Sequence, residues 1–386
     1  MDAYTTGLHH CTTKVMRVAL SVNYRGKIVR VPVRISSATW RQLDHDAPMT
    51  PLQRYQSMLT GGTPDHLPRI PILMQFAAEH IGSNYGAFAS DHRVLVEANI
   101  ACAEEFGFEQ VSCICYAREA AAFGNEVEFV NDGPPRFRHY VLEDNRDIAQ
   151  LSAQPPEECP HTRDLIDAVR LYRQRVGDHY SVLGWVEGPA AAAADLRGVS
   201  TYLLDMMDEP EWCEELMNRC VAYAIDFARA QIAAGADTIG VGDAIASQVS
   251  ARLYTKLILP LERKLVDAIH AAGARVRLHI CGNITHILPG IATLGVDLID
   301  IDHMVDLATA RKILGPRIVL VGGIDPVTAI LNADPETIRR STVAAAQQAH
   351  APYCVAGGCE IPSRTAAANL HALCVPLVQP EPALPR

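Results

Sequence analysis

The chain has 386 residues, of which 49% are hydrophobic and 20% are charged, and its formal net charge is −10 with a pI of about 5.8. A chain of this length and composition can bury a large core, either as one α/β barrel or as two domains. The acidic balance argues against a general nucleic-acid or anionic-membrane binder, because such proteins gather Lys and Arg on one surface.

The cysteine content indicates free thiols rather than a disulfide framework. Eleven cysteines are an odd number, and no feature of the sequence directs the chain to an oxidising compartment. The apolar run at 15–22 is short for a signal peptide and contains Arg17, and no run approaches 18 apolar residues. We therefore expect a cytoplasmic protein that does not span a membrane.

Residues 1–48 differ in pattern from the rest of the chain. Two β-prone runs within 18–33 flank a turn at 25–26, which predicts a hairpin in an N-terminal extension. The pattern then becomes helical, because Thr50 is a favourable N-cap and is followed by a first-turn proline. A helix is expected over 51–59.

Short apolar runs then alternate with segments of helical spacing. Eight such runs are found at 70–76, 110–115, 181–187, 237–243, 276–281, 297–302, 317–323 and 353–359. The clearest helical segments between them are 91–106, 210–233, 250–271 and 335–350. Strands that are apolar on both faces and alternate with helices are typical of a parallel sheet covered on both sides.

Eight such units in about 320 residues predict a (β/α)8 TIM barrel. The barrel is expected to occupy residues 49–378. The stretch at about 130–175 is longer and more polar than one βα unit needs, which indicates an insertion. Residues 379–386 are rich in proline and are expected to form a loose tail.

Polar residues stand at the predicted carboxyl ends of these strands, where TIM-barrel enzymes have their active sites. They are Gln75, Cys115, Glu187, Asp243, His279, Cys281, Asp302 and Cys359. We expect these side chains to face one end of the barrel.

A metal site is predicted among them. His279 and Cys281 lie two residues apart, so on a strand both side chains leave the same face. Cys359 ends the last predicted strand, and in a small barrel it can reach the same centre. One imidazole and two thiolates suit Zn²⁺ in a catalytic site, where three protein ligands leave a fourth position open. The plainer interpretation is a buried thiol beside a hydrogen-bonded core histidine, but the barrel position favours the metal.

Two acidic residues are candidates for catalysis. Glu187 and Asp243 could supply a fourth metal ligand or handle a proton, and each could instead accept backbone N–H bonds at a strand end. The nearby Gly240-Val-Gly242 begins like a dinucleotide-binding loop, but the third glycine is missing, so we reject that motif.

Four further residues are candidates for substrate binding: Gln75, Arg118, Asp302 and His303. The alternative for Arg118 is a surface ion pair with its neighbour Glu119. The alternative for Asp302 and His303 is that they orient a metal ligand.

Two segments carry a specific resemblance to a known family. They are His279-Ile-Cys-Gly282 and Gly357-Gly-Cys-Glu-Ile-Pro362. Weaker matches occur at 62–68, 187–189, 195–198, 234–237 and 249–254. Over about 51–378 the chain resembles the uroporphyrinogen decarboxylase superfamily, and within it the zinc-dependent, corrinoid-linked methyltransferases.

The resemblance implies transfer of a methyl group between a small methylated substrate, of methoxy, methylamine or thiol type, and a separate corrinoid protein. It also implies that His279, Cys281 and Cys359 hold Zn²⁺. The cofactor is expected on a partner, because the run from Asp267 to Gly273 has one residue too many for a cobalamin motif and lies in a predicted helix. The direction of transfer cannot be read from the ligands.

Two alternatives remain from the sequence. One is a decarboxylase-like lyase that uses no metal, although the run at 74–80 lacks the arginines with which true decarboxylases hold the carboxylates of their substrate. The other is a non-catalytic barrel that binds the corrinoid protein. The acidic composition leaves open whether the chain forms a homodimer.

Overall fold

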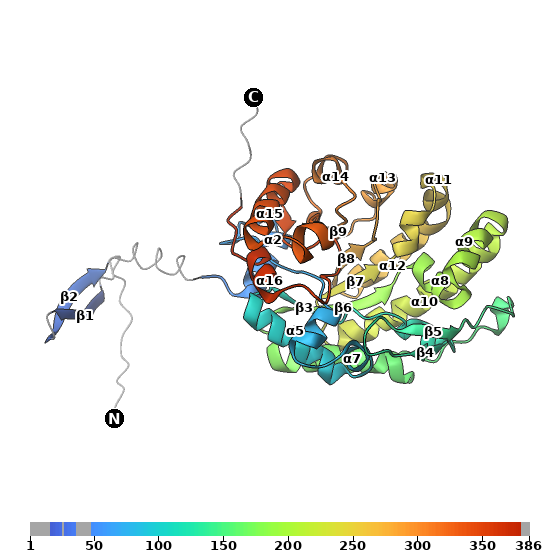
Figure 1. The fold of residues 1–386 in the computed structure, drawn as a ribbon, viewed down its shortest axis with the longest axis horizontal. Coiled ribbons are helices and arrows are strands. Elements are labelled where there is room, and N and C mark those ends of the chain that lie inside the picture. Colours follow the sequence, from blue (N-terminus) through green and yellow to red (C-terminus); the bar gives the residue numbers. More distant parts are fainter. Residues whose placement is uncertain (1–15, 25–26, 36–47, 380–386) are drawn as a thin grey trace, which may run out of the picture. The chain divides into compact units, whose positions relative to one another are not determined.

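The computed structural model describes residues 16–24, 27–35 and 48–379 (Figure 1). The chain divides into two compact units, Met1–Met49 and Thr50–Arg386. In the first unit, β1 (Met16–Tyr24) pairs with β2 (Lys27–Ile35) in one continuous antiparallel register. This pairing confirms the expected hairpin-like extension, whose turn at 25–26 lies outside the described residues, as does the tail beyond 379.

The second unit is built around seven parallel strands. They are β3 (Gln110–Ser112), β6 (Ser181–Glu187), β7 (Thr238–Gly242), β8 (Arg275–His279), β9 (Leu298–Ile301), β10 (Val319–Gly322) and β11 (Tyr353–Cys354). Each strand pairs with the next one of this series, so that β3 and β11 are the two edges of the sheet. Every residue of β6 to β10 except Glu187 and Arg275 is buried, as expected for strands covered by helices.

The first predicted strand, at 70–76, is wrong as a regular strand. The segment makes one isolated bridge, between Arg69 and Val355, and then turns into the helix α3 (Gln75–His80). The physical reason is two prolines, Pro68 and Pro71, which have no N–H to donate to a ladder.

This segment, which includes Arg69 and Ile70 and is called the closing segment below, nevertheless closes the sheet into a barrel. On one side the Ile70 N–H donates to the Val355 carbonyl at 3.0 Å, and on the other the Glu109 N–H donates to the Arg69 carbonyl at 3.1 Å. Val355 directly follows β11 and Glu109 directly precedes β3. The predicted TIM barrel is therefore confirmed, with an irregular segment in the place of its first strand.

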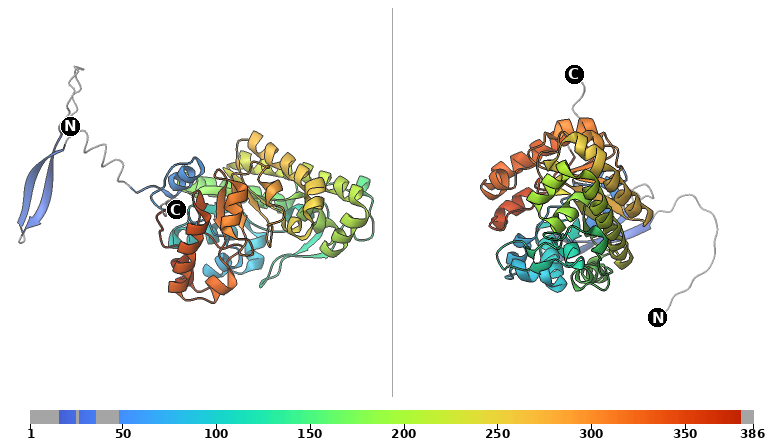
Figure 2. Two further views of the ribbon diagram at one scale, coloured as in Figure 1. Left: turned by 90° about the horizontal axis from the view of Figure 1, so that it is seen from above. Right: turned by 90° about the vertical axis from the view of Figure 1, so that its right-hand side faces the viewer.

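Helices cover the outside of the strands in all three views (Figures 1 and 2). The longer ones are α2 (Pro51–Leu59), α5 (His92–Phe106), α7 (Pro160–Val176), α8 (Pro189–Arg197), α9 (Val199–Asp208), α10 (Pro210–Ala234), α12 (Leu259–Ala271), α14 (Leu307–Leu314) and α15 (Pro335–Ala349). Shorter ones are α4 (Tyr85–Ser90), α6 (Arg118–Ala122), α11 (Ala251–Leu253), α13 (Leu288–Ile291) and α16 (Ala367–Leu373), with single turns η1 (Ile148–Gln150), η2 (Ala244–Gln248), η3 (Tyr254–Ile258) and η4 (Val327–Leu331). Within the described residues, no helix is both long and apolar enough to cross a membrane.

Local sequence explains where several of these helices begin. Thr50 caps α2 with a reciprocal pair of hydrogen bonds to Gln53 at the third helical position, a capping box. The expected helix at 250–271 forms from α11, η3 and α12, with one π-helical turn in its course. In the stretch at 130–175, β5 (Arg136–His139) pairs with β4 (Glu126–Glu128) apart from the barrel sheet, whereas α7 packs against α5 and α10.

A buried carboxylate ties the closing segment to its neighbours. Glu109 is fully buried, and it accepts hydrogen bonds from Arg54 Nη1 at 2.7 Å and from Arg69 Nη2 at 2.8 Å. Burial alone would raise the pKa of Glu109, but hydrogen bonds from His66 and Arg69 lower it below its ordinary value. The carboxylate is therefore ionised, and it neutralises part of the positive charge of Arg54 and Arg69.

Replacing this carboxylate should destabilise the barrel. We expect Glu109→Gln to lower the free energy of unfolding by about 3–5 kcal/mol, because the buried Arg69 guanidinium loses its carboxylate partner. Urea denaturation at pH 7 measures the loss. Since the folded pKa is depressed, the stabilisation is present above the unfolded pKa of about 4.3 and fades as the pH falls below it. The exposed Glu126→Gln, which removes a surface pair with Arg138, should leave the free energy of unfolding unchanged within the precision of the measurement.

Candidate metal centre

Three side chains converge at the carboxyl end of the barrel. His279 Nε2 lies 3.0 Å from Cys281 Sγ and 3.7 Å from Cys359 Sγ, and the two sulfur atoms are 3.4 Å apart. Together they form a group whose ligand atoms all lie within 4.8 Å of one another. The structure thus brings together the three residues that the sequence proposes as a ligand set.

Strand register explains why these side chains meet. His279 is the last residue of β8, and Cys281 follows two residues later on the same face. Cys359 arrives from the loop after β11, which approaches the neighbouring backbone closely. A Cβ atom at Gly358 would lie 2.7 Å from the backbone nitrogen of His303, so only glycine fits there.

A carboxylate that the sequence interpretation missed fixes the orientation of the histidine. Asp300, opposite His279 on β9, accepts a hydrogen bond from His279 Nδ1 at 3.0 Å and ion-pairs with Arg277 at 2.7 Å. Burial alone would raise the pKa of Asp300, but Arg277 and His279 lower it, so the carboxylate is charged. Because Nδ1 is engaged, Nε2 is the nitrogen that faces the two sulfurs. This is the arrangement found behind metal-binding histidines.

The three groups share their protons unequally. The hydrogen bond from Cys281 lowers the pKa of the Cys359 thiol to about 5, against the effect of burial. The same hydrogen bond and burial raise the pKa of Cys281. Burial alone would lower the pKa of His279, but hydrogen bonds to Asp300 and Cys359 raise it to about 10. Near neutral pH one thiolate therefore lies beside an imidazolium and a thiol.

The donor set fits Zn²⁺. Tetrahedral zinc with Zn–S bonds of about 2.3 Å and Zn–N bonds of about 2.0 Å separates its ligand atoms by roughly 3.5–3.8 Å. The three separations, 3.0, 3.4 and 3.7 Å, need only small side-chain adjustments to reach these values. Thiolate and imidazole ligands also select zinc over magnesium or calcium, which prefer oxygen.

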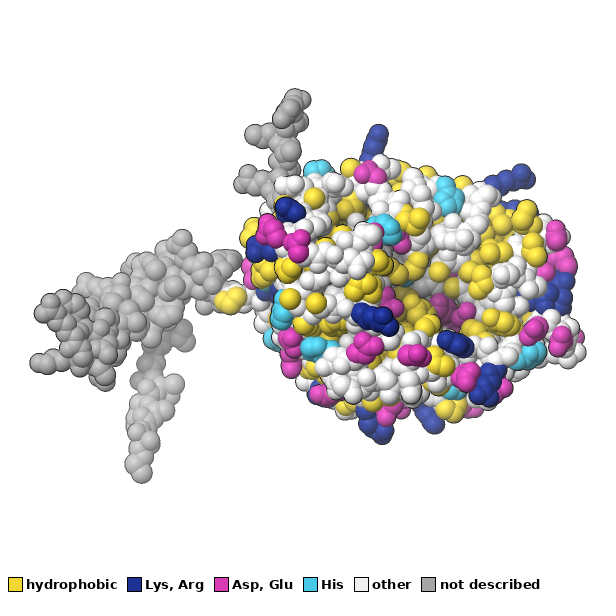
Figure 3. Space-filling model, viewed as in Figure 1, with side chains coloured by type: hydrophobic (Ala, Val, Ile, Leu, Met, Phe, Trp, Pro, Cys, Tyr) yellow, Lys and Arg dark blue, Asp and Glu magenta, His cyan; other side chains and the backbone are white. Residues whose placement is uncertain are grey.

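A small cavity of about 90 Å³ adjoins the three residues. Its other lining residues are Ile72, Ile114, Tyr116, Trp185, Glu187, Gly242, Ala244 and Glu360. Figure 3 shows that the surface is hollowed beside α8, with acidic side chains inside the hollow and hydrophobic side chains over α9 next to it. The cavity therefore offers room for a small ligand in direct contact with the candidate metal centre.

Glu187 lines the cavity, as expected for a catalytic candidate. Its carboxylate accepts a hydrogen bond from Trp185 Nε1 at 3.0 Å, and its N–H donates to Glu119 at 3.0 Å. Burial, together with repulsion from Asp195, raises the pKa of Glu187 to about 8. A carboxyl group whose pKa is near neutrality can give or take a proton at that pH.

Trp185 and two glycines shape the cavity. The indole lies over β7, where a Cβ atom at Gly240 would be 2.3 Å from Trp185 Cε3 and one at Gly242 would be 2.4 Å from Cζ2. The glycines of the rejected dinucleotide motif therefore serve to let this ring lie flat against the strand. Trp185 could have been found from its position, because it stands two residues before Glu187 on the same strand face.

Asp243 does not line the cavity. It is fully buried, and its carboxylate accepts the N–H groups of Ala190 at 3.3 Å and Ala191 at 2.7 Å at the start of α8. This is the structural alternative that the sequence left open, a strand-end carboxylate that accepts backbone hydrogen bonds. Glu360 takes a place that the sequence analysis missed, since it lines the cavity directly after Cys359.

The four substrate-binding candidates lie outside the lining of this cavity. Gln75 starts α3 and donates its N–H to Glu360 at 3.2 Å. Arg118 is buried and pairs with Asp164 at 3.0 Å, so a surface ion pair with Glu119 is wrong. Asp302 accepts the Gly282 N–H at 2.9 Å and thus supports the loop that carries Cys281. The half-exposed His303 lies 2.9 Å from Asp302.

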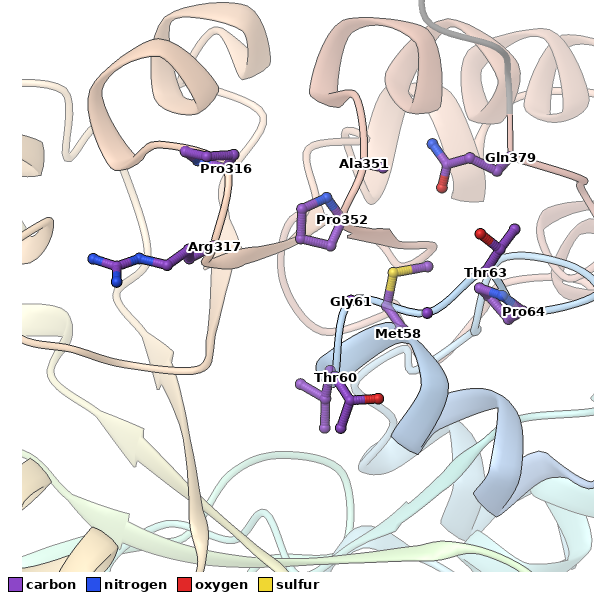
Figure 4. Close-up of a pocket in the computed structure, with 12 residues that line it drawn as sticks. Met58, Thr60, Gly61, Thr63, Pro64, Pro316, Arg317, Ala351, Pro352 and Gln379 are labelled. Atoms are coloured by element: carbon purple, nitrogen blue, oxygen red, sulfur yellow. The ribbon is translucent and has the colours of Figure 1, made fainter.

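A larger cavity, of about 490 Å³, lies at the opposite end of the barrel (Figure 4). It is bordered by the loop after α2 and by the residues that precede β10 and β11, including Arg317 and Pro352. Its lining contains no His, Cys, Asp or Glu side chain. The candidate metal ligands and the two cavity carboxyl groups lie instead at the smaller cavity, at the carboxyl ends of the strands, where TIM-barrel enzymes have their active sites.

Fold and site together define an α/β barrel with a His/Cys/Cys centre at the active-site end. Residues 50–375 match the family described as uroporphyrinogen decarboxylase (URO-D). The chain belongs to the uroporphyrinogen decarboxylase family.

Several relatives are methyltransferases, and others are uroporphyrinogen decarboxylases. A methylcobamide:CoM methyltransferase of Methanosarcina mazei is 28% identical over 335 residues, which cover 84% of this chain and 96% of that protein. A methylated-thiol–coenzyme M methyltransferase of the same organism is 22% identical over 300 residues, covering 76% of this chain and 80% of that protein. A solved structure, described as a methyltransferase from Methanosarcina mazei, has a TM-score of 0.77 at 21% identity and covers 84% of this chain and 97% of that chain.

Metal affinity should depend steeply on pH. A metal bound by His279 and Cys281 displaces a proton from each, whereas Cys359 is already a thiolate above about pH 5. We therefore expect the apparent affinity for Zn²⁺ to rise about 100-fold per pH unit between about pH 6 and 9. Competition with a chromophoric chelator, corrected for the chelator's own protonation, measures the slope. An affinity independent of pH over this range would contradict the ligand assignment.

Proposed function

We propose that this chain is a zinc-dependent methyltransferase that moves a methyl group between a small methylated substrate and a separate corrinoid protein. The observation that carries the proposal is the convergence of His279, Cys281 and Cys359 beside a small cavity at the active-site end of the barrel. The names of the methyltransferase relatives, which include methylcobamide, support both the reaction and the corrinoid partner.

The ligand residues have distinct tasks in this proposal. His279, Cys281 and Cys359 would hold the ion, and Asp300 keeps the His279 ring turned so that Nε2 faces it. Bound zinc supplies Lewis acidity, which stabilises a substrate thiolate or draws electron density from a heteroatom that carries the methyl group. Three protein ligands leave one position for that substrate atom.

Glu187 would stabilise the charge on the substrate heteroatom that carries the methyl group. When protonated, it can donate to the oxygen of a methoxy donor as the C–O bond breaks. When ionised, it can accept a thiol proton or pair with a positively charged nitrogen. The hydrogen bond from Trp185 Nε1 fixes the carboxylate in the cavity, so its oxygen is held in place for either task.

Decarboxylation of a tetrapyrrole is poorly supported by the same cavity. The substrates of true decarboxylases carry several carboxylates, which require positively charged partners. The described lining contains two carboxyl groups, Glu187 and Glu360, and no Lys or Arg. A volume of about 90 Å³ is also far below the roughly 300–1,000 Å³ of pockets for larger ligands.

Removing one sulfur should abolish metal binding and turnover together. We expect Cys359→Ser to lose more than nine-tenths of its zinc and of its methyl transfer, because a hydroxyl is a poor substitute for a thiolate ligand. Elemental analysis measures the metal. Decay of the Co(I) spectrum of a reduced corrinoid partner, with methoxy, methylamine and methylthio compounds as donors, measures transfer. Cys354→Ala, which removes a buried thiol of β11 outside the site, is the matched control and should keep its metal. Stoichiometric zinc in Cys359→Ser would refute the assignment of Cys359 as a metal ligand.

Glu187 should affect turnover without affecting the metal. We expect Glu187→Gln to reduce kcat about 10²–10⁴-fold, because the amide can neither transfer a proton nor carry a charge. Zinc content should stay at one equivalent, since Glu187 is not among the three ligands. Loss of zinc in this variant would instead identify Glu187 as a fourth ligand, and unchanged kcat would remove it from the mechanism.

A further inference from the structure

We propose that a groove beside the cavity is the docking site for the corrinoid-carrying protein, and that it accepts an apolar segment of that protein which also bears carboxylates. The inference rests on the proposed function, which requires such a partner but leaves its contact surface open. The size of the cavity, the position of the groove and the chemistry of the groove's two walls carry the inference.

The cavity is too small to receive the cofactor itself. Its volume of about 90 Å³ lies far below the roughly 300–1,000 Å³ of pockets that hold drug-sized ligands, and a corrinoid ring is larger than such ligands. The corrinoid must therefore stay on its own protein and stand over the mouth of the cavity. A surface of that protein then has to cover the barrel around the mouth.

The groove lies one short helix away from the cavity. It has a volume of about 460 Å³, and it lies between α9 with the start of α10 on one side and the segment 248–256 on the other. The 3₁₀-helix η2 connects the two spaces, because Ala244 at its start lines the cavity and Gln248 at its end lines the groove. At a rise of about 2.0 Å per residue, these two residues are roughly 8 Å apart. A protein seated in the groove therefore also reaches the cavity.

One wall of the groove is an exposed apolar helix face. Leu203, Met206 and Met207 of α9 line the groove, and Leu204 extends the apolar surface beyond it. Met207 is 77% exposed, the highest value among the large apolar side chains that the structure describes. Figure 3 shows hydrophobic side chains over α9 beside the hollow. Such a surface marks an interaction site, and the flexible side chain of methionine suits contact with another protein.

The other wall carries positive charge. Arg252 and Lys256 line the groove, are exposed, and make no ion pair with any residue that the structure describes. The described lining of the groove contains no Asp or Glu, although the whole chain has a net charge of −10. Two unpaired cations opposite an apolar wall favour a partner segment that combines apolar side chains with carboxylates.

Both walls are held in place by the barrel itself. Asp205 of α9 accepts a hydrogen bond from Arg197 of α8 at 2.8 Å. On the other side, the Val249 carbonyl accepts a hydrogen bond from His286 Nε2 at 2.8 Å, and His286 belongs to the loop that follows Cys281. The groove is therefore preformed, which lowers the free-energy cost of binding. One of its walls is attached to the loop beside the candidate metal centre.

Binding of corrinoid proteins to the full chain, purified with its metal, tests the inference. The probes are the corrinoid-binding proteins encoded in the same genome, each purified with hydroxocobalamin, and biolayer interferometry measures their affinity. We expect at least one of them to bind. Arg252→Glu combined with Lys256→Glu should weaken that binding at least about 10-fold, because like charges then face each other. Met207→Ser should weaken it at least about 5-fold, because an apolar anchor is lost.

Matched variants on the outer helices separate docking from a general change of charge. Lys312→Glu combined with Arg339→Glu reverses one Lys and one Arg on α14 and α15, and Val343→Ser removes an exposed apolar side chain of α15. Both variants should bind the corrinoid protein as the unchanged chain does.

Free cob(I)alamin provides a second readout, because it needs no docking surface. The groove variants should transfer methyl groups to it at the rate of the unchanged chain, whereas their KM for the corrinoid protein should rise. A lower rate with free cob(I)alamin would show that the groove residues act on the chemistry, and would overturn the docking assignment.

Three binding results would also overturn the inference. They are no binding by any of the corrinoid proteins, equal binding by the groove variants and the unchanged chain, and self-association of the chain that is lost when Arg252 and Lys256 are replaced by Glu. Light scattering after gel filtration measures the self-association, which would identify a second copy of the chain as the occupant of the groove.

The two proposals can fail separately. Corrinoid-protein binding that depends on the groove, without methyl transfer from any donor, would refute the proposed function and keep the docking assignment. Methyl transfer to a corrinoid protein, with unchanged binding and KM in the groove variants, would refute the docking assignment and keep the function.

Discussion

The carboxylate of Asp300, held between Arg277 and His279, is the interaction on which the site depends. It neutralises a guanidinium buried inside the barrel, and it sets which nitrogen of His279 faces the two cysteine sulfurs. Arg277 in turn donates to Gln110 at 2.9 Å and to the Ile70 carbonyl at 3.0 Å, so this pair also links β8 to β3 and to the closing segment. The stability of the barrel and the orientation of the candidate metal ligand His279 therefore depend on the same buried carboxylate.

The register of adjacent strands places the remaining parts of the site in one layer. Glu187, Gly242, His279 and Asp300 lie opposite one another on β6 to β9, and the layer below contains Trp185, Gly240 and Arg277. β7 contributes no side chain to these layers, and the indole of β6 fills the space. A carboxyl group, an aromatic surface and a candidate metal ligand, all from the strands themselves, thus face one small cavity.

Much of this could be predicted from the sequence. The alternation of apolar runs and helical segments predicted the barrel. The two-residue spacing of His279 and Cys281 predicted two of the three converging side chains. The prediction of the first strand was wrong because it used hydrophobicity alone. Pro68 and Pro71 have no backbone N–H to donate to a neighbouring strand. Arg118 looked like a surface residue because its partner, Asp164, is 46 positions away. Asp300 and Glu360 were missed because their roles depend on neighbours in space rather than in sequence.

The closing segment has a mechanical consequence for the cavity. It joins its two neighbours through few backbone bonds, and it continues into Ile72, a wall of the cavity, whose carbonyl accepts the Ile361 N–H just after Glu360. The segment with sparse backbone pairing thus continues directly into a wall of the cavity. Local fluctuations concentrate where backbone pairing is sparse, so we expect the fluctuations of the barrel beside the cavity to be greatest along this segment.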